Sequence, residues 1–559
     1  MPLHRLPRLL LPALFAPAIL AAQAAPPPAD LIVVNARIYT VDEGRPRAEA
    51  LAVRGGRVQF AGSRRGAETL RGPQTRIVDA GGATIIPGIA DAHVHLLGLG
   101  QALRTVDLTG TRSLDDVIGR IAARARELPA GTWVTGRGWD QNDWPDTRLP
   151  VHDALSRAVP NHPVYVVRVD GHAAFTNAAA LRIAGLTRET QSPSGGRIEL
   201  TAAGEPTGVL VDAAMGLVSR RIPPASRDQV RDATLAAIRE VNRLGLTSVH
   251  DAGVDAATID VYEELARAGT YSLRNYVMIR QDDSTLARYF RRGPQTALYD
   301  GRLWIRAIKI SADGALGSRG AALLDPYSDE ASHSGLILTS GERIRDVAAR
   351  ALRAGFQLNV HAIGDRGNRV VLDAFADALR QVPSADHRFR VEHAQILHHD
   401  DIPRFAELDV IPSMQSTHQT SDMYWAPNRI GFSRSLGAYA WRSLLNTGVI
   451  IANGTDFPVE PVNPMFTFHS AITRQDGNGW PTGGWFADQR MTRDEALKSM
   501  TIWPAYAAFQ EASLGSLSIG KWADFVVLDR DIMTVSPDQV RGTVVLSTWI
   551  AGRPVFERR

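Results

Sequence analysis

The sequence predicts an α/β fold, in which a (β/α)8 TIM-like barrel carries a small β-sandwich module built from both ends of the chain. Three observations lead to this prediction. Short β-rich runs alternate with helical stretches through the middle of the chain, side chains of metal-ligand type follow several of these runs, and both ends consist of strand and turn sequences. Eight alternating strands are typical of a closed parallel barrel, whose functional groups lie at the carboxyl ends of the strands.

The first 25 residues predict a secretory signal peptide. His4, Arg5 and Arg8 precede an apolar run, residues 9–22, which is followed by small side chains. The run is short for a bilayer span and is interrupted by prolines, so a permanent anchor is the weaker alternative. We therefore expect a periplasmic or secreted mature chain without a membrane span.

The small β-sandwich module is expected in residues 30–84 and 512–559. Residues 31–40 near the N-terminus, and residues 515–529 and 544–552 near the C-terminus, have the apolar runs and flanking turn residues of strands. We expect the two ends of the chain to contribute strands to one shared sheet.

The barrel is expected in residues 85–511. Its predicted strands are the one that carries His93 and His95 and the runs at residues 247–251, 274–279, 307–310, 357–361, 390–393, 410–414 and 449–453. An open doubly wound sheet is the alternative, but it gathers side chains from the first and last strands less naturally. Residues 100–242 are too many for one connecting helix, so we expect an excursion over the barrel mouth that can form part of the pocket.

The composition excludes several classes of protein. Among the 559 residues, 62 Lys and Arg oppose 59 Asp and Glu, and a net charge of +3 does not indicate a nucleic-acid partner. A content of 44% hydrophobic and 22% charged residues is typical of a soluble globular protein. Because the chain has no cysteine, any metal must be held by nitrogen and oxygen ligands.

Two pairs of histidines and one aspartate are the candidate metal ligands. His93 and His95 are two residues apart on a predicted strand, so both rings point to the same side, where neutral imidazoles suit zinc and similar ions. His361 and His393 each follow a β-rich run and can enter the same cavity. The alternative for all four is a core or surface histidine. Asp456 follows the last run and is the candidate general base, with a structural turn cap as its alternative.

Six short segments occur in the order typical of one family. They are Pro87-Gly88 with Asp91-Ala92-His93-Val94-His95, Gly171-His172-Ala173-Ala174 with Asn177, residues 313–321, residues 361–365, residues 392–395 and residues 454–460. In this combination the sequence resembles the amidohydrolase superfamily, and specifically amidohydrolase family 3, the YtcJ-like proteins. The resemblance covers nearly the whole mature chain.

The resemblance implies a hydrolase with one or two divalent metal ions, zinc being the leading candidate. It also implies that a lysine on the fourth strand, here Lys309, carries an N6-carboxylate that bridges two metals. An apolar strand lowers the pKa of a lysine, and a neutral amine can take up carbon dioxide. An uncarboxylated Lys309 in an ion pair is the alternative.

Two further residues are candidates for substrate binding. His172 resembles a family position near the substrate, and Arg319 can bind a carboxylate or a carbonyl through its planar donors. A structural hydrogen bond for His172 and an ordinary ion pair for Arg319 are the alternatives. Asp365 and Glu392 adjoin ligand candidates and are expected either to orient imidazoles or to form salt bridges.

The predicted function is hydrolysis of a non-peptide C–N, amide-type bond of a small molecule by metal-activated water. In this interpretation Asp456 takes a proton from water and returns it to the leaving nitrogen. An esterase, lactonase or phosphoesterase that uses the same centre is one alternative, and a non-catalytic exported binding protein is another. A homo-oligomer is compatible with the sequence.

Overall fold

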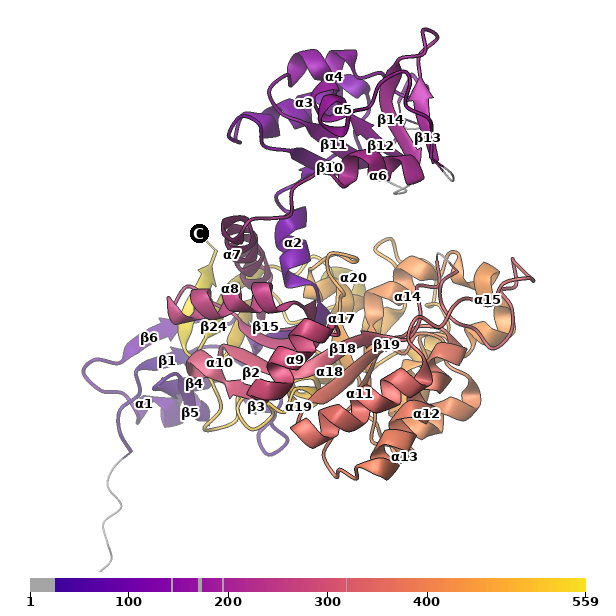
Figure 1. Cartoon of the computed structure of the whole chain (residues 1–559). Helices are drawn as coiled ribbons and strands as arrows, with labels where there is room; N and C mark the ends of the chain where they lie inside the picture. Colours follow the sequence, from indigo (N-terminus) through magenta and orange to yellow (C-terminus); the bar gives the residue numbers. More distant parts are fainter. Residues whose placement is uncertain (1–25, 142–143, 169–172, 194–195, 318, 559) are drawn as a thin grey trace, which may run out of the picture.

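The computed structural model describes residues 26–141, 144–168, 173–193, 196–317 and 319–558, so the predicted signal peptide and His172 lie outside the described residues. In the described ranges, no helix is long and apolar enough to cross a membrane. Figure 1 shows a large barrel body, the end module beside it and a separate lobe.

The barrel is a sheet of eight parallel strands, as predicted. In sheet order the strands are β8 (Ile89–Val94), β15 (Leu246–Val254), β16 (Arg274–Arg280), β18 (Leu303–Ser311), β19 (Gln357–Ala362), β20 (Arg390–His393), β21 (Ile411–Gln415) and β22 (Ala452–Gly454). Every neighbouring pair in this order is parallel. Each predicted barrel strand overlaps one of these strands.

Polar contacts bring the last strand beside the first. The Asp91 carboxylate on β8 accepts hydrogen bonds from the backbone N–H and the hydroxyl of Thr455, which follows β22. A Cβ atom at Gly454 would lie 2.6 Å from the backbone nitrogen of His93, so only glycine permits this approach. The first and last barrel strands therefore deliver their side chains to one cavity.

Amphipathic helices surround the barrel. They include α7 (Arg227–Arg243), α8 (Ala256–Arg267), α9 (Asp283–Arg292), α11 (Gly341–Ala354), α12 (Asp365–Gln381), α13 (Ile402–Glu407), α17 (Pro464–Thr473), α18 (Arg493–Ser499) and α19 (Ile502–Ala507). Two more helices, α14 (Ser416–Asp422) and α15 (Ala426–Ser435), follow β21. Leu, Val and Ile side chains from the helices and strands pack into one continuous core.

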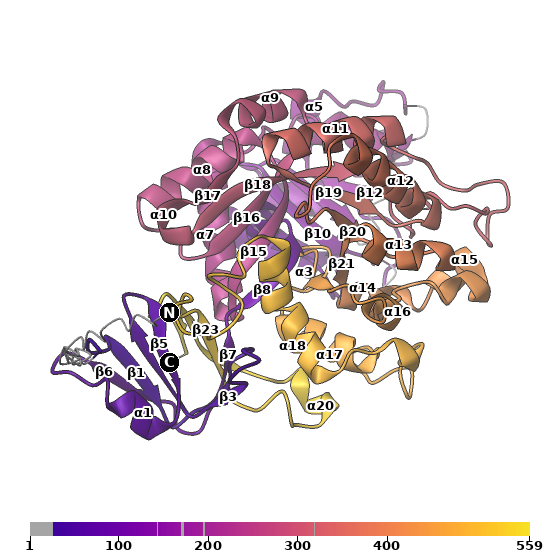
Figure 2. The same ribbon diagram turned by 90° about the horizontal axis from the view of Figure 1, so that it is seen from below.

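The two ends of the chain share a sheet, as predicted. Its strand order is β25 (Arg553–Glu557), β24 (Val545–Ile550), β23 (Phe525–Leu528), β7 (Thr84–Pro87), β2 (Arg37–Tyr39) and β3 (Arg47–Ala48). A second sheet contains β5 (Arg57–Gly62), β4 (Ala50–Arg54), β1 (Leu31–Val34) and β6 (Arg76–Asp79). Apolar residues of both sheets form a common core, and Figure 2 shows the N-terminal strands β1, β5 and β7 in one module with the C-terminal strand β23.

The long excursion is a folded lobe with a sheet of its own. The sheet order is β13 (Gly196–Leu200), β14 (Pro206–Asp212), β12 (Ala173–Thr176), β11 (Val164–Arg168), β10 (Val134–Trp139) and β9 (Val106–Asp107). Its helices include α3 (Leu114–Ala125), α4 (Asp153–Ala158), α5 (Ala178–Ala184) and α6 (Gly216–Ser219). Trp139 and Trp144 are buried in the core of the lobe, with ring centroids 6.1 Å apart. These two aromatic rings therefore stabilise the lobe itself.

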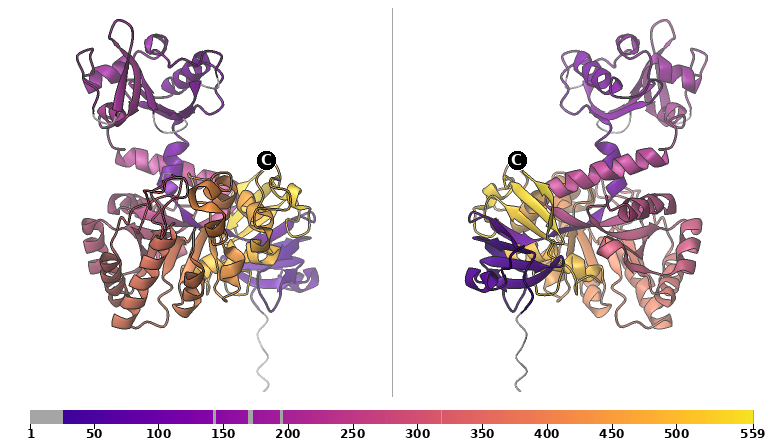
Figure 3. Two further views of the ribbon diagram at one scale, coloured as in Figure 1. Left: turned by 90° about the vertical axis from the view of Figure 1, so that its right-hand side faces the viewer. Right: turned by 90° about the vertical axis from the view of Figure 1, so that its left-hand side faces the viewer.

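The lobe is joined to the barrel through α2 (Leu96–Ala102) and α7. The two helices pack closely, because a Cβ atom at Gly100 would lie 2.0 Å from the backbone oxygen of Ala233. Figures 1 and 3 show the lobe standing apart from the barrel body. A contribution of the lobe to the substrate pocket stays a prediction.

Candidate metal centre

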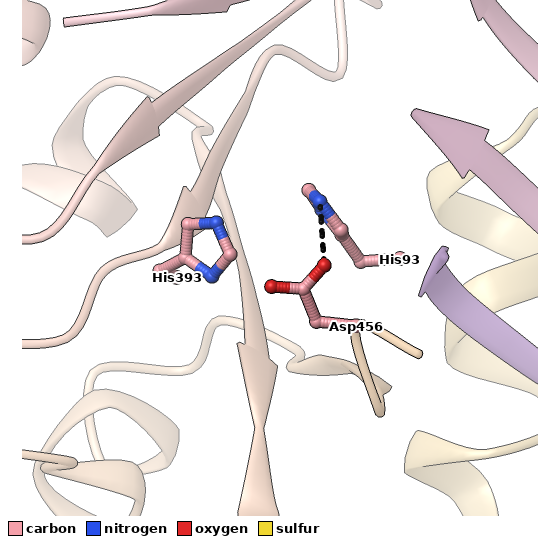
Figure 4. A group of neighbouring side chains, drawn as sticks. All are labelled: His93, His393 and Asp456. Atoms are coloured by element: carbon pink, nitrogen blue, oxygen red, sulfur yellow. Dashed lines mark ion pairs between the residues drawn. The ribbon is translucent and has the colours of Figure 1, made fainter. Parts of the chain in front are cut away.

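The predicted ligands lie at the carboxyl ends of the barrel strands. His93 belongs to β8 and His95 follows it, His361 belongs to β19, His393 ends β20, and Asp456 comes two residues after β22. Because carboxyl ends of parallel strands meet at one end of a barrel, the five side chains converge. Figure 4 shows His93, His393 and Asp456 facing one another.

The ligand atoms surround a small common space. Potential ligand atoms of His93, His393 and Asp456 all lie within 4.8 Å of one another. The Oδ1 atom of Asp456 is 3.2 Å from Nε2 of His95 and 3.7 Å from Nε2 of His93. Both His393 and Asp456 have positive backbone φ angles, 76° and 61°, which are unusual for residues with a side chain and are held by the surrounding structure.

Each of three imidazoles is oriented by a partner behind it. The Nδ1 atom of His93 lies 2.5 Å from Oε2 of Glu392, so the predicted orienting role of Glu392 is confirmed. Nδ1 of His95 contacts the backbone oxygen of Ala252 at 3.1 Å, and Nδ1 of His393 contacts Oε1 of Gln415 at 2.7 Å. All three partners are acceptors, so each Nδ1 donates its proton and each Nε2 keeps a lone pair.

Glu392 is itself held by a buried arginine. Arg390 on the same strand forms an ion pair with Glu392, and both side chains are fully buried. Burial alone would raise the pKa of Glu392, but the charge of Arg390 and the interaction with His93 lower it to about 2. The carboxylate behind His93 is therefore ionised near neutral pH.

Several buried atoms at this centre have no hydrogen-bond partner among the described residues. They include Nε2 of His93 and Oδ1 of Asp456, which lie 3.7 Å apart, and Nε2 of His361. Burying a polar atom without a partner is unfavourable, and a cation that accepts nitrogen and oxygen ligands removes this penalty for such atoms. The donor set therefore fits a divalent metal ion such as zinc.

The protonation of the histidines also suits a metal. Burial lowers the pKa of His361 to about 3 and lowers the pKa of His393 well below its usual range. Burial also lowers the pKa of His93, although Glu392 opposes this effect. These rings are therefore neutral at pH 7, which is the form that binds a metal ion.

His361 and Lys309 lie beside this group. The rings of His361 and His393 meet edge to face at 4.5 Å, while Nε2 of His361 is 3.6 Å from Oδ1 of Asp313. Burial lowers the pKa of Lys309, and the negative charges of Glu392 and Asp456 oppose this effect. Part of the Lys309 side chain remains open to solvent. The structure thus brings the predicted ligands together, while the role of each as a ligand stays a prediction.

The remaining predicted residues lie in other settings. Arg319 donates to Asp329 and pairs with Glu330, which is the ion-pair arrangement that the sequence left open. Its role in substrate binding stays a prediction. Asp365 orients no imidazole and forms no salt bridge among the described residues; its Oδ1 accepts from the backbone N–H groups of Leu324 and Arg366. That prediction was wrong because Asp365 instead holds the segment at Leu324 against the first turn of α12.

Sequence reasoning missed a further histidine, His418 on α14. Its Nε2 lies 3.8 Å from Oδ2 of Asp456, and its ring stacks on that of His393 with centroids 5.8 Å apart. His418 comes three residues after the end of β21, so its position just beyond a strand end was the signal that could have identified it. Gln415, which orients His393, was also missed.

The sequence and the fold resemble those of known proteins. Residues 76–556 match the amidohydrolase family profile. The chain is a member of the amidohydrolase family. It is 33% identical to the putative amidohydrolase YtcJ of Bacillus subtilis over 93% of this chain and 98% of that protein. It is 30% identical to an N-substituted formamide deformylase of Arthrobacter pascens over 95% of this chain and 98% of that protein.

A solved structure of a relative supports the same assignment. An uncharacterized metal-dependent hydrolase from Pyrococcus furiosus has a TM-score of 0.75 and 27% sequence identity, and the match covers 90% of this chain and all of that one. This amidohydrolase-family chain therefore belongs to a metal-dependent family of hydrolases, which agrees with the unpartnered ligand atoms at the barrel mouth.

Proposed function

We propose that this amidohydrolase-family protein hydrolyses a non-peptide C–N, amide-type bond of a small molecule. The observation that carries the proposal is the pair of buried, unpartnered atoms, Nε2 of His93 and Oδ1 of Asp456, at the carboxyl end of the barrel. The relative named N-substituted formamide deformylase, which is aligned over almost the whole chain, supports the bond type.

The metal site that we propose consists of His93, His95, His361, His393 and Asp456. A divalent ion bound there, with zinc as the leading candidate, lowers the pKa of a water molecule and polarises a carbonyl group. The partners behind the imidazoles hold the Nε2 atoms toward the centre before any ion binds. Metal binding therefore costs little conformational entropy of these side chains, because they are already oriented.

Asp456 is the proposed general base. Burial opposes its ionisation, but the close contact with Nε2 of His95 and the neighbouring imidazoles hold its pKa well below the usual range. Asp456 takes a proton from the attacking water, whose oxygen bonds to the carbonyl carbon. It then delivers this proton to the nitrogen as the C–N bond breaks.

Lys309 is the proposed carboxylated residue. Its Nζ would bond to the carbon of CO2 and lose a proton, and the resulting carbamate would offer two oxygens as metal ligands. The lowered pKa of Lys309 supports this step, because only the neutral amine reacts. Purified enzyme incubated with 13C-labelled bicarbonate is expected to show a carbamate carbon signal that Lys309→Met lacks. An identical signal in that variant would refute the assignment.

The bond type is tested by metal analysis together with a substrate panel. We expect purified protein to contain a divalent metal, to release amine from N-formyl or N-acyl compounds, and to lose this activity on chelation. Re-addition of zinc should restore it. Activity confined to oxygen esters would contradict the proposal, and His399→Gln, a change at a histidine with a largely exposed side chain, is the matched control.

We also propose that the protein is exported, on the basis of the N-terminal residues His4, Arg5 and Arg8 and the apolar run after them. Cell fractionation is expected to place the mature protein in the periplasm or the medium, with a new N-terminus near residue 25. Recovery of the full-length chain in the cytoplasm would contradict this.

A further inference from the structure

The Nε2 atom of His418 faces Asp456, the proposed general base, without forming a hydrogen bond to it. The side chain follows β21 on α14 and the residue is 9% exposed. Its Nε2 has no hydrogen-bond partner among the described residues, and it lies 3.8 Å from Oδ2 of Asp456. A buried histidine nitrogen that faces a carboxylate without contacting it indicates that a third group belongs between them.

The two oxygens of Asp456 face different neighbours. Oδ1 faces the imidazoles of His93 and His95, whereas Oδ2 faces His418. A separation of 3.8 Å is too long for a direct hydrogen bond, but one atom can lie about 2.9 Å from both Oδ2 and Nε2. Asp456 therefore has a metal side and a second side that remains available to the substrate.

Two acidic side chains lie near His418: Asp422 is on the same helix, one turn later, and Glu460 contacts this helix through Ser421. Asp422 ends α14, and its Oδ2 accepts hydrogen bonds from Tyr439 and Gln395. Ser421 donates to Glu460, which comes four residues after Asp456. Burial raises the pKa of Glu460, and the negative charges of Asp422 and Asp456 act in the same direction while His418 opposes them. The charges of Glu460, Asp422 and Asp456 are therefore close enough to interact with one another and with His418.

We propose that His418 is a catalytic residue that binds the leaving nitrogen of the substrate between its Nε2 and Oδ2 of Asp456, and that Asp422 and Glu460 favour an amine that becomes a cation once it is released. This inference rests on the proposed amide hydrolysis and names its substrate class. The preferred substrates are amides of basic alkyl amines.

The proton balance needs no additional reactant. Asp456 receives one proton from water, and the water oxygen bonds to the carbonyl carbon. When the C–N bond breaks, the nitrogen keeps the bonding electron pair and takes the proton from Oδ2 of Asp456. His418 only hydrogen-bonds to this nitrogen and aligns its lone pair with Oδ2. The products are a carboxylic acid and a neutral amine, and the acid then passes its proton to the amine to give a carboxylate and an alkylammonium ion.

Two substrates with the same acyl group and different leaving groups test the role of His418. One is the N-butyl amide, whose nitrogen needs a proton to leave; the other is the 4-nitroanilide, whose weakly basic nitrogen departs with less help. We expect His418→Phe to lower kcat/KM for the butyl amide by about 10- to 100-fold, as expected for the loss of one hydrogen bond to a charged group. The nitroanilide should change by less than about 3-fold on the same scale.

The controls separate this role from a structural one. Metal content and the thermal midpoint are expected to match wild type, and His418→Gln, which keeps a polar atom near Nε2, should recover part of the loss. His399→Gln should behave as wild type. An equal loss on both substrates, or no loss on either, would overturn the role of His418. If wild-type enzyme with bound metal cleaves no amide at all, the proposed function fails instead.

Product binding tests the acidic surroundings without turnover. We expect n-butylamine to inhibit the wild-type enzyme, and Glu460→Gln to weaken this inhibition several-fold, because one negative charge near the bound alkylammonium ion is lost. Inhibition by n-butanol, a neutral molecule of similar shape, should not change. Equal inhibition of Glu460→Gln and wild type by the amine would overturn the proposed cation preference.

Discussion

Two sets of buried polar groups, one at each end of the barrel, differ in their hydrogen bonding. At the amino end, where the end module packs, Arg274 and Asp524 form a buried bidentate pair, and Arg274 also donates to the backbone oxygens of Asp300 and Gly301. The Trp522 ring lies between the guanidinium groups of Arg57 and Arg274, 4.1 and 4.9 Å away. The donors of this arginine are satisfied within the protein.

At the carboxyl end, the corresponding groups remain unsatisfied. Nε2 of His93, Oδ1 of Asp456 and Nε2 of His418 are buried without a hydrogen-bond partner among the described residues. A satisfied network stabilises the fold, whereas unsatisfied groups held in place by their neighbours are available to a metal and a substrate. The satisfied pair at the amino end is therefore expected to stabilise the fold, and the unsatisfied groups at the carboxyl end are expected to serve catalysis. Variants at each end test this division.

The largest effect on activity is expected at Asp456. Asp456→Asn removes the proton acceptor while keeping the size of the side chain, so kcat is expected to fall by roughly 100- to 10,000-fold. The thermal midpoint should stay close to that of wild type, because Oδ1 makes no hydrogen bond that the fold needs. Steady-state kinetics on an amide substrate and thermal unfolding check both parts; a wild-type rate would remove Asp456 from the mechanism.

The largest effect on stability is expected at the other end of the barrel. Arg274→Met leaves Asp524 buried without its partner, and breaking such a pair is expected to lower the free energy of unfolding by about 3–5 kcal/mol. The enzyme that remains folded should keep its kcat, because the pair lies far from the metal centre along the barrel. Denaturant unfolding and active-site titration measure the two quantities. A large loss of kcat per folded molecule would break the proposed separation.

A smaller effect is expected where an orienting partner is changed. Glu392→Gln weakens the acceptor behind His93, so zinc affinity is expected to fall by about 10- to 100-fold. Metal titration with a competing chelator measures this affinity, and excess zinc should restore most of the activity. If zinc affinity is unchanged, Glu392 does not support metal binding, and its role is the buried ion pair with Arg390.

The smallest effect is expected at Arg319. This side chain pairs with Asp329 and Glu330 near the surface, so Arg319→Gln should leave the thermal midpoint close to that of wild type. A comparison of KM for substrates with and without a carboxylate then separates the two roles left open by the sequence. A selective increase of KM for the carboxylated substrates would favour substrate binding, and equal values would favour the ion pair alone.

The sequence by itself determined the barrel, the shared sheet of the two chain ends and the convergence of five candidate ligands. It could do so because strand periodicity and turn residues are local signals, and because the carboxyl ends of parallel strands must meet at one end of a barrel. His93, His95, His361, His393 and Asp456 all carry this signal.

Only the tertiary structure decided which partner each polar group meets. Glu392 orients His93, Asp365 binds backbone N–H groups, and His418 faces Asp456 from a helix after another strand. These contacts join residues far apart in the chain, so no local pattern specifies them. The physical reason is that hydrogen bonds and burial depend on distances of a few ångströms, which are set by the packing of the whole barrel.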